Sequence, residues 1–449
     1  MRELLAGIVG KNNVSVDGYE LLCYSRDCGS MYPVRPQYVV IPKCRQHVEQ
    51  IMRLAYRRKN PVVARGAGTS MCGAPIPVEN TSILLDLTSL RQLEINEDAR
   101  IVIADAGVTW TELMLFLERK GWEIAHEGPW SAPSATLGGS LAVGAISMGF
   151  ARYGGLGTQI TGLEVVLPNG QRVVTGSGAN PGSTMVMREC NGTDLTGLFI
   201  GSHGVLGIVT RVALKIYPLS REQAFSSFGF PSLAALIAAI KKITLTEAIY
   251  DCRLFISPVP EQIPGKYGFA YMIKARNGDI KTMAERARNA ALSAGGTENV
   301  AFGKEFYLGR HTARVKAFGK AGPGWLEVAG FVPFDLYEPI ANKVLVYFAQ
   351  RQAEMDRLGV RWSLGGLLES RSLNIPMALF CNELKTDARG KMLVYLEELG
   401  EIMFGMGVSP YWIGKQNREA MWRLGPTYEL HRTIKKALDP DNILNPGIL

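Results

Sequence analysis

Residues 61–77 read PVVARGAGTSMCGAPIP, and the interpretation of the whole chain depends on this stretch. Its two adjacent valines predict a short apolar strand that leads directly into a glycine-rich loop with Gly66, Gly68 and Gly73. Glycine tolerates the positive φ angles that turn successive backbone N–H groups towards one point, and it lets a ligand approach the main chain. The stretch therefore predicts either a diphosphate-binding loop or an ordinary turn between two strands, and one such loop alone favours the turn.

A second glycine-rich stretch changes that balance. Residues 134–157 read SATLGGSLAVGAISMGFARYGGLG, in which small residues fill many gaps between the glycines. A chain with so little side-chain bulk allows a large, flat ligand to lie against its backbone. The sequence LEVVLPNGQRVV follows, and its Asn169-Gly170 pair predicts a β-hairpin. Beyond another glycine turn, GSHG, a long strand is expected to end at Pro218.

Length and composition exclude several classes of protein. A chain of 449 residues, with 47% apolar and 20% charged residues, predicts a globular protein of two or three domains. The formal charge of +8 comes from scattered residues, without the basic runs and interleaved aromatics of a nucleic-acid groove. That charge suits an anionic substrate, an acidic partner or a membrane surface, and it equally suits a solubilising surface.

Targeting and redox signals indicate a cytoplasmic protein. The start, MRELLAGIVGKNNVSV, resembles no signal peptide, and no long apolar run predicts a transmembrane helix, although peripheral contact with the inner face of the membrane stays open. The seven cysteines form no CxxC pair, so we expect reduced thiols and no iron–sulfur or zinc site within the chain.

Local patterns divide the chain into domains. Residues 44–57 predict an amphipathic helix, and Thr109 with Glu112 predicts a capping box at the start of another helix. After Pro218, helices and strands alternate (helices at 233–243, 281–294 and 335–358), which predicts a second α+β domain inserted before a short C-terminal return. We therefore expect domains at 1–218, 219–414 and 415–449.

These motifs carry a family resemblance. Five motifs occur in this order: ARGAGTS, SATLGGSLA, YGGLGTQITGLEVVLPNGQRV, GSHGVLGIVTRVALKIYP and LDPDNILNPG. Together they resemble the FAD-linked oxidases of the vanillyl-alcohol oxidase/p-cresol methylhydroxylase (PCMH) class. The resemblance is strongest to the branch of glycolate oxidase FAD subunits and D-lactate dehydrogenases. The resemblance covers residues 20–218 and the last dozen well, and residues 219–430 loosely. It implies an α+β fold, with a PCMH-type FAD-binding domain of two subdomains and an inserted α+β cap domain.

The resemblance assigns cofactor roles to matching positions. Backbone amides of the first loop are expected to hold the FAD diphosphate: Arg65, Gly66, Ala67, Gly68, Thr69, Ser70, with Gly73 beside them. Other positions are expected to line the flavin and its ribityl chain or to pack beside FAD: Pro133, Thr136, Leu137, Gly139, Ser140, Ala142, Tyr153, Gly204, Ile208. Some relatives link the flavin to a histidine where this chain has Thr69, so we expect non-covalent FAD.

The sequence departs from the family where metal-dependent members bind substrate. Those relatives carry HxGDGNxH in the cap and EHGIG near the end. Here the corresponding segments read GGLLESR (365–371) and PYWIG (410–414), and the chain has five histidines in all. A three-histidine site for a divalent ion cannot be assembled at those positions. We therefore expect no metal.

The remaining chemistry needs a hydride acceptor and a group that receives the hydroxyl proton. Tyr411 is the first candidate for a substrate-contacting residue, and packing against the flavin is the alternative. Lys415 could receive an anion or lower a phenol pKa, or serve as surface charge. Arg310, in a segment that resembles the WxxR motif of the cap, could bind a carboxylate in a two-pronged geometry or form a structural ion pair.

Weaker candidates are Arg253 and His311, while His203 fits the adenine side of the cofactor or the surface better than catalysis.

Three functions follow from these candidates. The first is a FAD-dependent dehydrogenase of a small hydroxylated substrate, above all a 2-hydroxy acid such as lactate or glycolate. The second is an oxidoreductase of a phenolic or other alcohol, suited to the aromatic pair Tyr411-Trp412. The third is a FAD-containing electron-transfer or assembly subunit without its own substrate site. Because the chain lacks iron–sulfur ligands, electrons must leave to a separate acceptor: an iron–sulfur protein, an electron-transferring flavoprotein, a quinone or oxygen. The resemblance favours an iron–sulfur partner.

Overall fold

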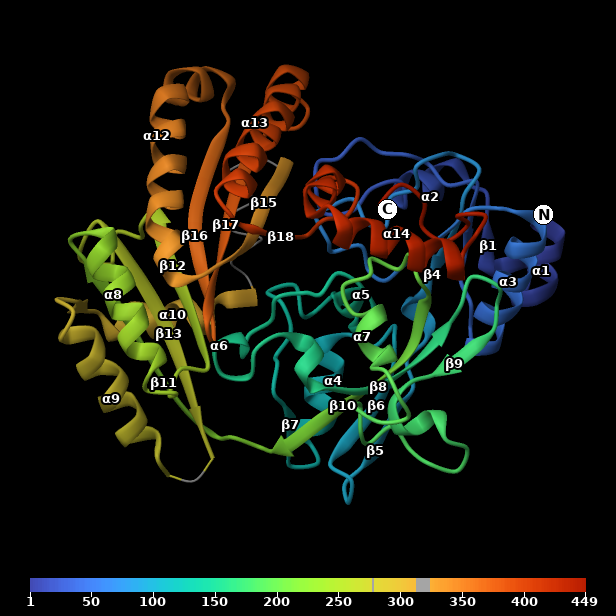
Figure 1. The fold of residues 1–449 in the computed structure, drawn as a ribbon, viewed down its shortest axis with the longest axis horizontal. Helices are drawn as coiled ribbons and strands as arrows, with labels where there is room; N and C mark the ends of the chain where they lie inside the picture. The colour runs from blue at the N-terminus through green and yellow to red at the C-terminus, as the bar shows by residue number, and fades with distance from the viewer. Residues whose placement is uncertain (277, 312–323) are drawn as a thin grey trace. The chain divides into compact units, whose positions relative to one another are not determined.

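The computed structural model describes residues 1–276, 278–311 and 324–449 (Figure 1). The chain forms two compact units. Unit 1 comprises Met1–Ile146, Leu156–Tyr217 and Ile413–Leu449, and unit 2 comprises Ser147–Gly155 and Pro218–Trp412. The breaks after Tyr217 and Trp412 lie close to the domain limits expected from sequence. The segment 147–155, which the sequence grouped with the second glycine-rich stretch, packs within unit 2.

The first sheet of unit 1 has the order β1-β2-β4-β3, in which β2, β4 and β3 are parallel. Its strands are β1 (Val14–Ser15), β2 (Tyr38–Val40), β3 (Val62–Arg65) and β4 (Ile83–Asp86). The helical elements beside it are α1 (Arg2–Val9), η1 (Lys11–Asn13), α2 (Gly18–Cys23) and α3 (Arg45–Arg58). The amphipathic prediction for α3 is confirmed, because its apolar residues are all buried: Val48, Ile51, Met52, Leu54, Ala55.

The second sheet of unit 1 has the order β5-β6-β10-β8-β9, with β7 paired to β10. Its strands are β5 (Leu93–Asn96), β6 (Ile101–Asp105), β7 (Trp122–Ile124), β8 (Ile160–Val166), β9 (Arg172–Val174) and β10 (Ile208–Pro218). The predicted hairpin is β8–β9, with Gly170 at a φ of 79° in its turn. Short helical elements accompany it: η2 (Leu87–Ser89), α4 (Trp110–Glu118), α5 (Leu137–Ala142), η3 (Leu156–Gln159), η4 (Gly176–Ala179), α7 (Leu195–Phe199). The capping box of α4, between Thr109 and Glu112, is present as predicted.

The C-terminal segment returns to the first sheet of unit 1. After η5 (Arg418–Leu424) and α14 (Pro426–Leu438), the chain runs beside β3. The N–H of Val62 donates to the carbonyl of Ile443, and the N–H of Asn445 donates to the carbonyl of Val62, both at 2.8 Å. The predicted return of the LNPG segment therefore places Asn445 at the start of the glycine loop.

Unit 2 is built on an antiparallel sheet in the order β14-β11-β13-β12-β16-β17-β15-β18. The strands are β11 (Glu222–Phe230), β12 (Asp251–Ser257), β13 (Tyr267–Ala275), β14 (Thr297–Glu298), β15 (Gly324–Val332), β16 (Arg361–Glu369), β17 (Ser372–Cys381) and β18 (Ser409–Tyr411). The helices are α6 (Phe150–Tyr153), α8 (Leu233–Thr244), α9 (Ile280–Leu292), α10 (Val300–Leu308), α12 (Phe334–Leu358) and α13 (Thr386–Gly405). The α+β class predicted from sequence is confirmed.

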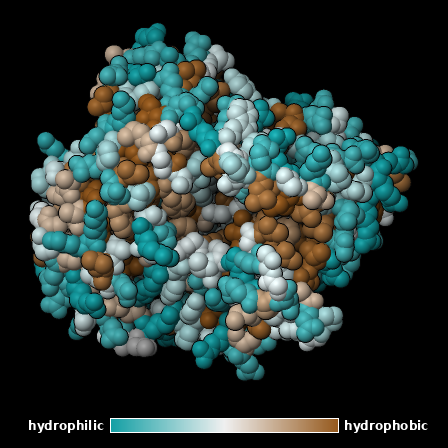
Figure 2. Space-filling view, in the orientation of Figure 1, coloured by the Kyte–Doolittle hydropathy of each residue, from teal (hydrophilic) through white to brown (hydrophobic). Residues whose placement is uncertain are grey.

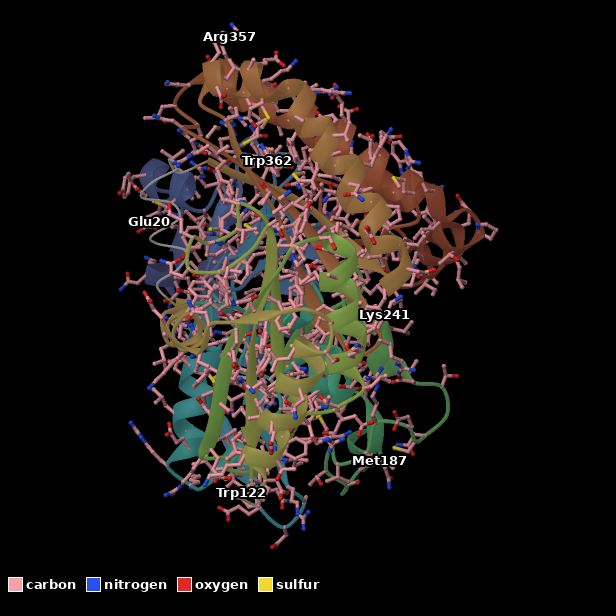
Figure 3. All side chains as sticks on the ribbon, turned by 90° about the vertical axis from the view of Figure 1, so that its left-hand side faces the viewer. Glu20, Trp122, Met187, Lys241, Arg357 and Trp362 are labelled. Carbon is pink, nitrogen blue, oxygen red and sulfur yellow. The ribbon has the colours of Figure 1, made fainter. Side chains whose placement is uncertain are left out.

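The long helices of unit 2 form a row, in which α9 packs on α8, α8 on α12, and α12 on α13. Their charged ends point outward, as Lys241 in α8 and Arg357 near the end of α12 show (Figure 3). Trp362 of β16 instead stacks on Phe348 of α12, with ring centroids 4.1 Å apart. Within the described ranges, no helix is long and apolar enough to cross a bilayer.

Candidate active site

The glycine loop of unit 1 offers a row of free backbone donors. Over the described part of the chain, the N–H groups of Ala67, Gly68, Thr69 and Ser70 donate no hydrogen bond to the protein. Gly68 has a φ of 68°, in the region that glycine tolerates best. Backbone donors without protein partners are the arrangement that an anionic ligand requires. This loop can therefore hold a diphosphate through its main chain.

The two glycine-rich stretches meet in unit 1. A Cβ at position 66 would collide with Oγ1 of Thr136, so only glycine lets the first loop pass so close to the second. The same Oγ1 caps α5 by accepting a hydrogen bond from the N–H of Gly139 at 3.3 Å. Gly138 in turn packs directly against Ala106. The sequence spacing alone did not show this contact, which joins the two predicted halves of the cofactor site.

The side chain of Arg65 packs against the glycine loop at Gly68. Its Nη1 donates to the carbonyl of Arg26 at 2.7 Å, and its guanidinium lies 5.5 Å from the ring centroid of Tyr24. A Cβ at Gly68 would collide with this guanidinium. The charge of Arg65 therefore lies next to Gly68 in the row of free amides, where it favours the binding of an anion.

Asp27 is a buried carboxylate that sequence reasoning missed. It accepts hydrogen bonds from the N–H groups of Gly29 at 2.9 Å and Gly73 at 2.8 Å, and so fixes the end of the glycine loop. Burial raises its pKa to about 6, although these N–H groups and the charge of Arg65 oppose the rise. The segment SRDCGS gave no signal for this role, because nothing local pairs Asp27 with a loop so distant in sequence.

Asn445 connects the C-terminal return to both glycine segments. Its Nδ2 donates to the carbonyl of Ala74 at 3.1 Å and to that of His203 at 2.7 Å. Its Oδ1 accepts from Nζ of Lys415 at 2.7 Å. The motif LNPG was recognised from sequence, but the role of its asparagine side chain was not.

The other predicted cofactor residues lie in different settings. Leu137 is in the hydrophobic core of unit 1, and the hydroxyl of Ser140 accepts a hydrogen bond from Nε1 of Trp110 at 2.9 Å. Pro133 is exposed, Gly139 is half-buried and Ile208 is buried at the start of β10. Ala142 accepts a hydrogen bond from the N–H of His203, which precedes Gly204 (φ 70°).

Tyr153 belongs to unit 2. Its ring packs edge-on against Tyr250 at 6.3 Å between centroids, and its hydroxyl accepts from Nη2 of Arg276 at 3.1 Å. The structure therefore brings Gly66 against Thr136 and Ala142 against the turn before Gly204, and it shows Tyr153 in a separate aromatic cluster. The contacts of all these residues with FAD stay predictions.

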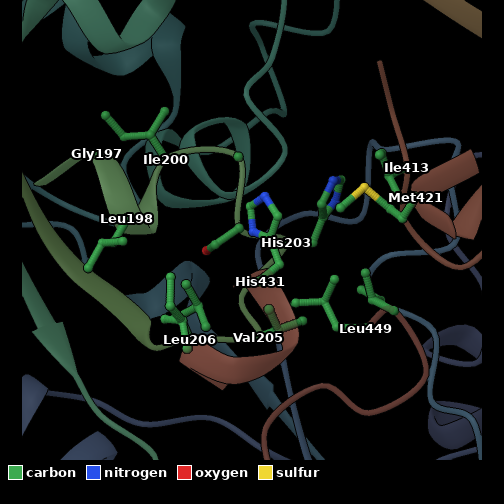
Figure 4. Close-up of a pocket in the computed structure, with 14 residues that line it drawn as sticks. Gly197, Leu198, Ile200, His203, Val205, Leu206, Ile413, Met421, His431 and Leu449 are labelled. Carbon is green, nitrogen blue, oxygen red and sulfur yellow. The ribbon is translucent and has the colours of Figure 1, made fainter. Parts of the chain in front are cut away.

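A mainly apolar pocket opens in unit 1 between α7, α14 and the turn 201–206 (Figure 4). Hydrophobic side chains gather on this face (Figure 2), and those that line the pocket include Leu198, Ile200, Leu206, Ile413, Met421, Ile434. The imidazoles of His203 and His431 add polar atoms to its wall. Nδ1 of His203 is buried and has no hydrogen-bond partner in the described chain, and burial lowers the pKa of this histidine to about 4. His203 therefore offers a neutral imidazole beside Gly204.

In unit 2, an aromatic run surrounds the first catalytic candidate, Tyr411. Phe150 stacks on Phe331 with centroids 6.1 Å apart, Phe331 meets Tyr411 edge-on at 5.8 Å, and Tyr411 lies 4.9 Å from Trp412. Trp412 has a φ of 57°, which is strained for a bulky residue. Sequence reasoning identified the Tyr411-Trp412 pair but missed Phe150 and Phe331, which are distant in sequence.

The charged candidates of unit 2 are engaged with other groups. Nε of Arg253 lies 2.8 Å from Oδ2 of the fully buried Asp251, which also accepts from the hydroxyl of Tyr307 at 3.0 Å. Burial, followed by the charge of Asp251, holds the pKa of Tyr307 well above its usual value. Nη1 of Arg310, just beyond α10, donates to the carbonyl of Tyr307 at 2.8 Å. The charge of Arg253 is thus neutralised by Asp251 on the same strand, and carboxylate binding by Arg310 stays a prediction.

Lys415 lies in unit 1, whereas Tyr411 and Arg310 lie in unit 2. Its Nζ donates to the carbonyl of Ala74 at 3.0 Å, and burial lowers its pKa to about 7. Within the described residues, no group of three or more His, Cys, Asp or Glu side chains could hold a metal ion, so the absence of a metal stays a prediction.

These features of unit 1 fit FAD. The free amides of Ala67 to Ser70 and the charge of Arg65 suit its diphosphate. Gly66, which has no side chain, lets the loop pass close to Thr136. FAD, when bound, supplies the redox chemistry by accepting a hydride equivalent, while the protein supplies binding and orientation.

Comparison with known proteins supports FAD as the cofactor. Residues 36–176 match the FAD binding domain family, and residues 413–449 match the C-terminal domain of FAD linked oxidases. The D-lactate dehydrogenase of Archaeoglobus fulgidus is 26% identical over 91% of this chain and 90% of the relative. The glycolate oxidase subunit GlcD of Escherichia coli is 26% identical over 95% of this chain and 86% of the relative. The Bacillus subtilis GlcD is 31% identical, over 49% of this chain and 45% of the relative.

Solved structures share the fold. The 4-ethylphenol oxidase of Gulosibacter chungangensis superimposes with a TM-score of 0.82 at 19% identity, covering 99% of this chain and 95% of that one. p-Cresol methylhydroxylase gives the same TM-score and coverage at 17% identity. The fold and the loop thus define a flavoprotein oxidoreductase that uses FAD. More specifically, the chain contains two domains of the FAD-linked oxidases and shares the fold of the PCMH-type enzymes, and a reaction at CH–OH groups fits its relatives.

Proposed function

We propose that this protein oxidises a small 2-hydroxy acid by hydride transfer to FAD and passes the electrons to a separate acceptor. The observation that carries the substrate class is Arg310, whose guanidinium is anchored to the end of α10 by the Tyr307 carbonyl. A guanidinium matches a carboxylate in a two-pronged geometry, which makes arginine the side chain best suited to bind a 2-hydroxy acid. Relatives named D-lactate dehydrogenase and glycolate oxidase subunit, aligned over most of the chain, support this class.

The proposed proton acceptor is Tyr411. The chain lacks the histidines with which metal-dependent relatives acidify the substrate hydroxyl, so a side chain must take that role. Tyr411 lies in the aromatic run, and in its phenolate form it can accept the hydroxyl proton of the substrate and become a neutral phenol.

A second candidate function is the oxidation of an aromatic alcohol. It is supported by the run of Phe150, Phe331, Tyr411 and Trp412, because aromatic side chains in contact favour a flat, apolar ligand. The two candidates differ in whether a carboxylate on the substrate is required.

The test is anaerobic bleaching of the bound flavin by D- and L-2-hydroxy acids and by phenolic alcohols. We expect rapid bleaching by one hydroxy acid, and a loss of on the order of a hundredfold in that rate in Arg310→Ala. The matched control is Arg357→Ala, an exposed arginine of the same unit, which should bleach at the wild-type rate. Bleaching only by phenolic alcohols, with no effect of Arg310→Ala, would establish the second candidate instead.

The same assay tests whether the chain has its own substrate site. If no compound bleaches the flavin, and only a purified iron–sulfur or electron-transferring flavoprotein partner reduces it, then the chain is an electron-transfer subunit and the proposal fails. We infer that such a partner is the acceptor in the forward reaction. Reoxidation of the substrate-reduced flavin by that partner, faster than by oxygen, would support this inference.

A further inference from the structure

A buried ammonium group lies behind the cofactor loop of unit 1. Nζ of Lys415 donates to the carbonyl of Ala74 at 3.0 Å and to Oδ1 of Asn445 at 2.7 Å. Both partners are neutral amide oxygens. Across the described residues, Lys415 forms no ion pair with a carboxylate. A buried cation that is only partly compensated favours an anion nearby, because burial removes the water that would otherwise solvate it.

The backbone around Lys415 is joined to the loop that offers free amides. The N–H groups of Lys415 and Gln416 both donate to the carbonyl of Cys72, at 2.9 and 3.1 Å. Gly414, at a φ of 48°, packs so closely on Cys72 that any side chain would collide with it. The N–H of Cys72 donates to Oγ of Ser70 at 3.3 Å. Lys415 is therefore two hydrogen bonds away from Ser70, the last residue of the amide row.

Asn445 extends the same network to the second glycine segment. Its side-chain amide bonds the carbonyls of Ala74 and His203 while its oxygen accepts from Lys415. A proton on Nζ of Lys415 is thus one part of an arrangement that holds the turns 72–74 and 201–204 together. Loss of that proton would remove both a positive charge and a donor from the network.

We propose that Lys415 is a positioning residue for the cofactor, whose positive charge and hydrogen bonds to Ala74 and Asn445 hold the loop for anionic FAD. This assigns Lys415 to FAD binding in unit 1 and not to the substrate chemistry for which the sequence suggested it. The inference depends on FAD as the cofactor and not on the identity of the substrate.

The proposal predicts a pH dependence of FAD affinity. The pKa of Lys415 is lowered to about 7, chiefly by burial, so its charge is lost as pH rises through neutrality. An anion that binds beside it raises this pKa, and by linkage FAD binds more weakly above pH 7 than below it. The affinity should therefore fall between about pH 6.5 and 8.5 by on the order of tenfold, or about 1.4 kcal/mol.

The other titratable groups that face Lys415 do not account for this window. Asp27, with a pKa raised to about 6, completes its ionisation in the lower part of the window, and a further negative charge there favours the protonated form of Lys415, which opposes the fall in affinity. Burial raises the pKa of Cys72 to about 11 and lowers that of His203 to about 4, so both are neutral throughout. Arg65 keeps its charge, although burial lowers its pKa.

The experiment is a fluorescence titration of the flavin-free protein with FAD at pH 6.5, 7.5 and 8.5. In Lys415→Met we expect about tenfold weaker FAD binding at pH 6.5 and no change in affinity up to pH 8.5, because methionine carries no charge at any pH. In Lys415→Arg we expect affinity near that of wild type at pH 6.5 and again no pH dependence, since arginine stays protonated. The control Lys436→Met removes an exposed lysine of α14 and should leave affinity and pH profile unchanged.

Either of two results would overturn the proposal: wild-type affinity that is constant from pH 6.5 to 8.5, or a pH dependence that persists in Lys415→Met. A purely structural role predicts the first result together with weak binding in both variants at every pH. If Lys415→Met fails to fold, as judged by circular dichroism, the profiles of wild type and Lys415→Arg still decide the question.

Discussion

The glycine loop of unit 1 and the charged cluster of unit 2 differ in how their polar groups are satisfied. In the described chain, the amides of Ala67 to Ser70 donate to no protein group, whereas Arg253 and Tyr307 both donate to the carboxylate of Asp251. A run of backbone donors without protein partners can hold an anionic ligand, while paired buried charges are typical of support for the fold. The proposed cofactor site is therefore built from backbone, whereas the proposed substrate site depends on side chains of unit 2.

The strongest test of this comparison is Gly66→Val. A side chain at position 66 collides with Thr136, so the loop must move away from α5. We expect FAD affinity to fall by more than about a hundredfold, since overpacking at such a contact costs about 1–3 kcal/mol before any loss of amide contacts. The measurement is the flavin content of the purified variant, and Gly7→Ala, in a helix with open space around the new Cβ, serves as control. Normal flavin content in Gly66→Val would show that the two stretches need not touch.

Asp251→Asn tests whether the buried charges of unit 2 support the fold. The change removes the negative charge that Arg253 and Tyr307 share in a fully buried position. We expect unit 2 to lose about 3 kcal/mol of stability, because breaking a buried ion pair leaves a charge without its counterion. Denaturant unfolding measures this loss, and the control Glu354→Gln, in an exposed pair with Lys391, should cost less than about 1 kcal/mol. Equal losses in the two variants would contradict the assignment.

Tyr411→Phe tests the reactive side chain of unit 2. Removal of the hydroxyl should slow flavin reduction by substrate by about a hundredfold, a typical contribution of a proton-transfer group. FAD affinity should stay the same, because the loop amides lie in unit 1. Stopped-flow absorbance gives the reduction rate, with Tyr395→Phe in α13 as the control. An unchanged rate in Tyr411→Phe would leave the residue with a packing role only.

The smallest expected effects come from two helix caps, one in each unit. Thr109 caps α4 in unit 1, and Ser232 caps α8 in unit 2 by accepting from the N–H of Ala235 at 3.2 Å. We expect Thr109→Ala and Ser232→Ala each to cost about 1 kcal/mol of stability. Thermal unfolding measures the loss, and flavin content and reduction rate should not change. A cap variant that loses flavin would show that local stability and cofactor binding are coupled.

Much of unit 1 was predictable from sequence, since its signals are local. Glycine-rich turns, the Asn169-Gly170 hairpin and the capping box at Thr109 each depend on neighbouring residues. The amphipathic pattern of α3 likewise identified its buried face. Asp27 and the side chain of Asn445 could not be predicted, because their partners lie far away in the chain.

The candidate site of unit 2 was less predictable for the same reason. The i, i+2 spacing of Asp251 and Arg253 was visible in DCRLFIS and could have shown that the arginine is neutralised on its own strand. The approach of Phe150 and Phe331 to Tyr411 had no such signal, since Phe150 joins unit 2 from within the glycine-rich stretch. Side-chain sites of this kind require the fold before they can be recognised.

The most direct test of the account is anaerobic reduction of the flavin in protein that has been treated with a strong metal chelator. The account predicts that the substrate found by the panel bleaches non-covalent FAD fully, and at the same rate as in untreated protein, because side chains of unit 2 and no divalent ion bind and deprotonate it. A loss of bleaching after chelation that added zinc or manganese restores would contradict it.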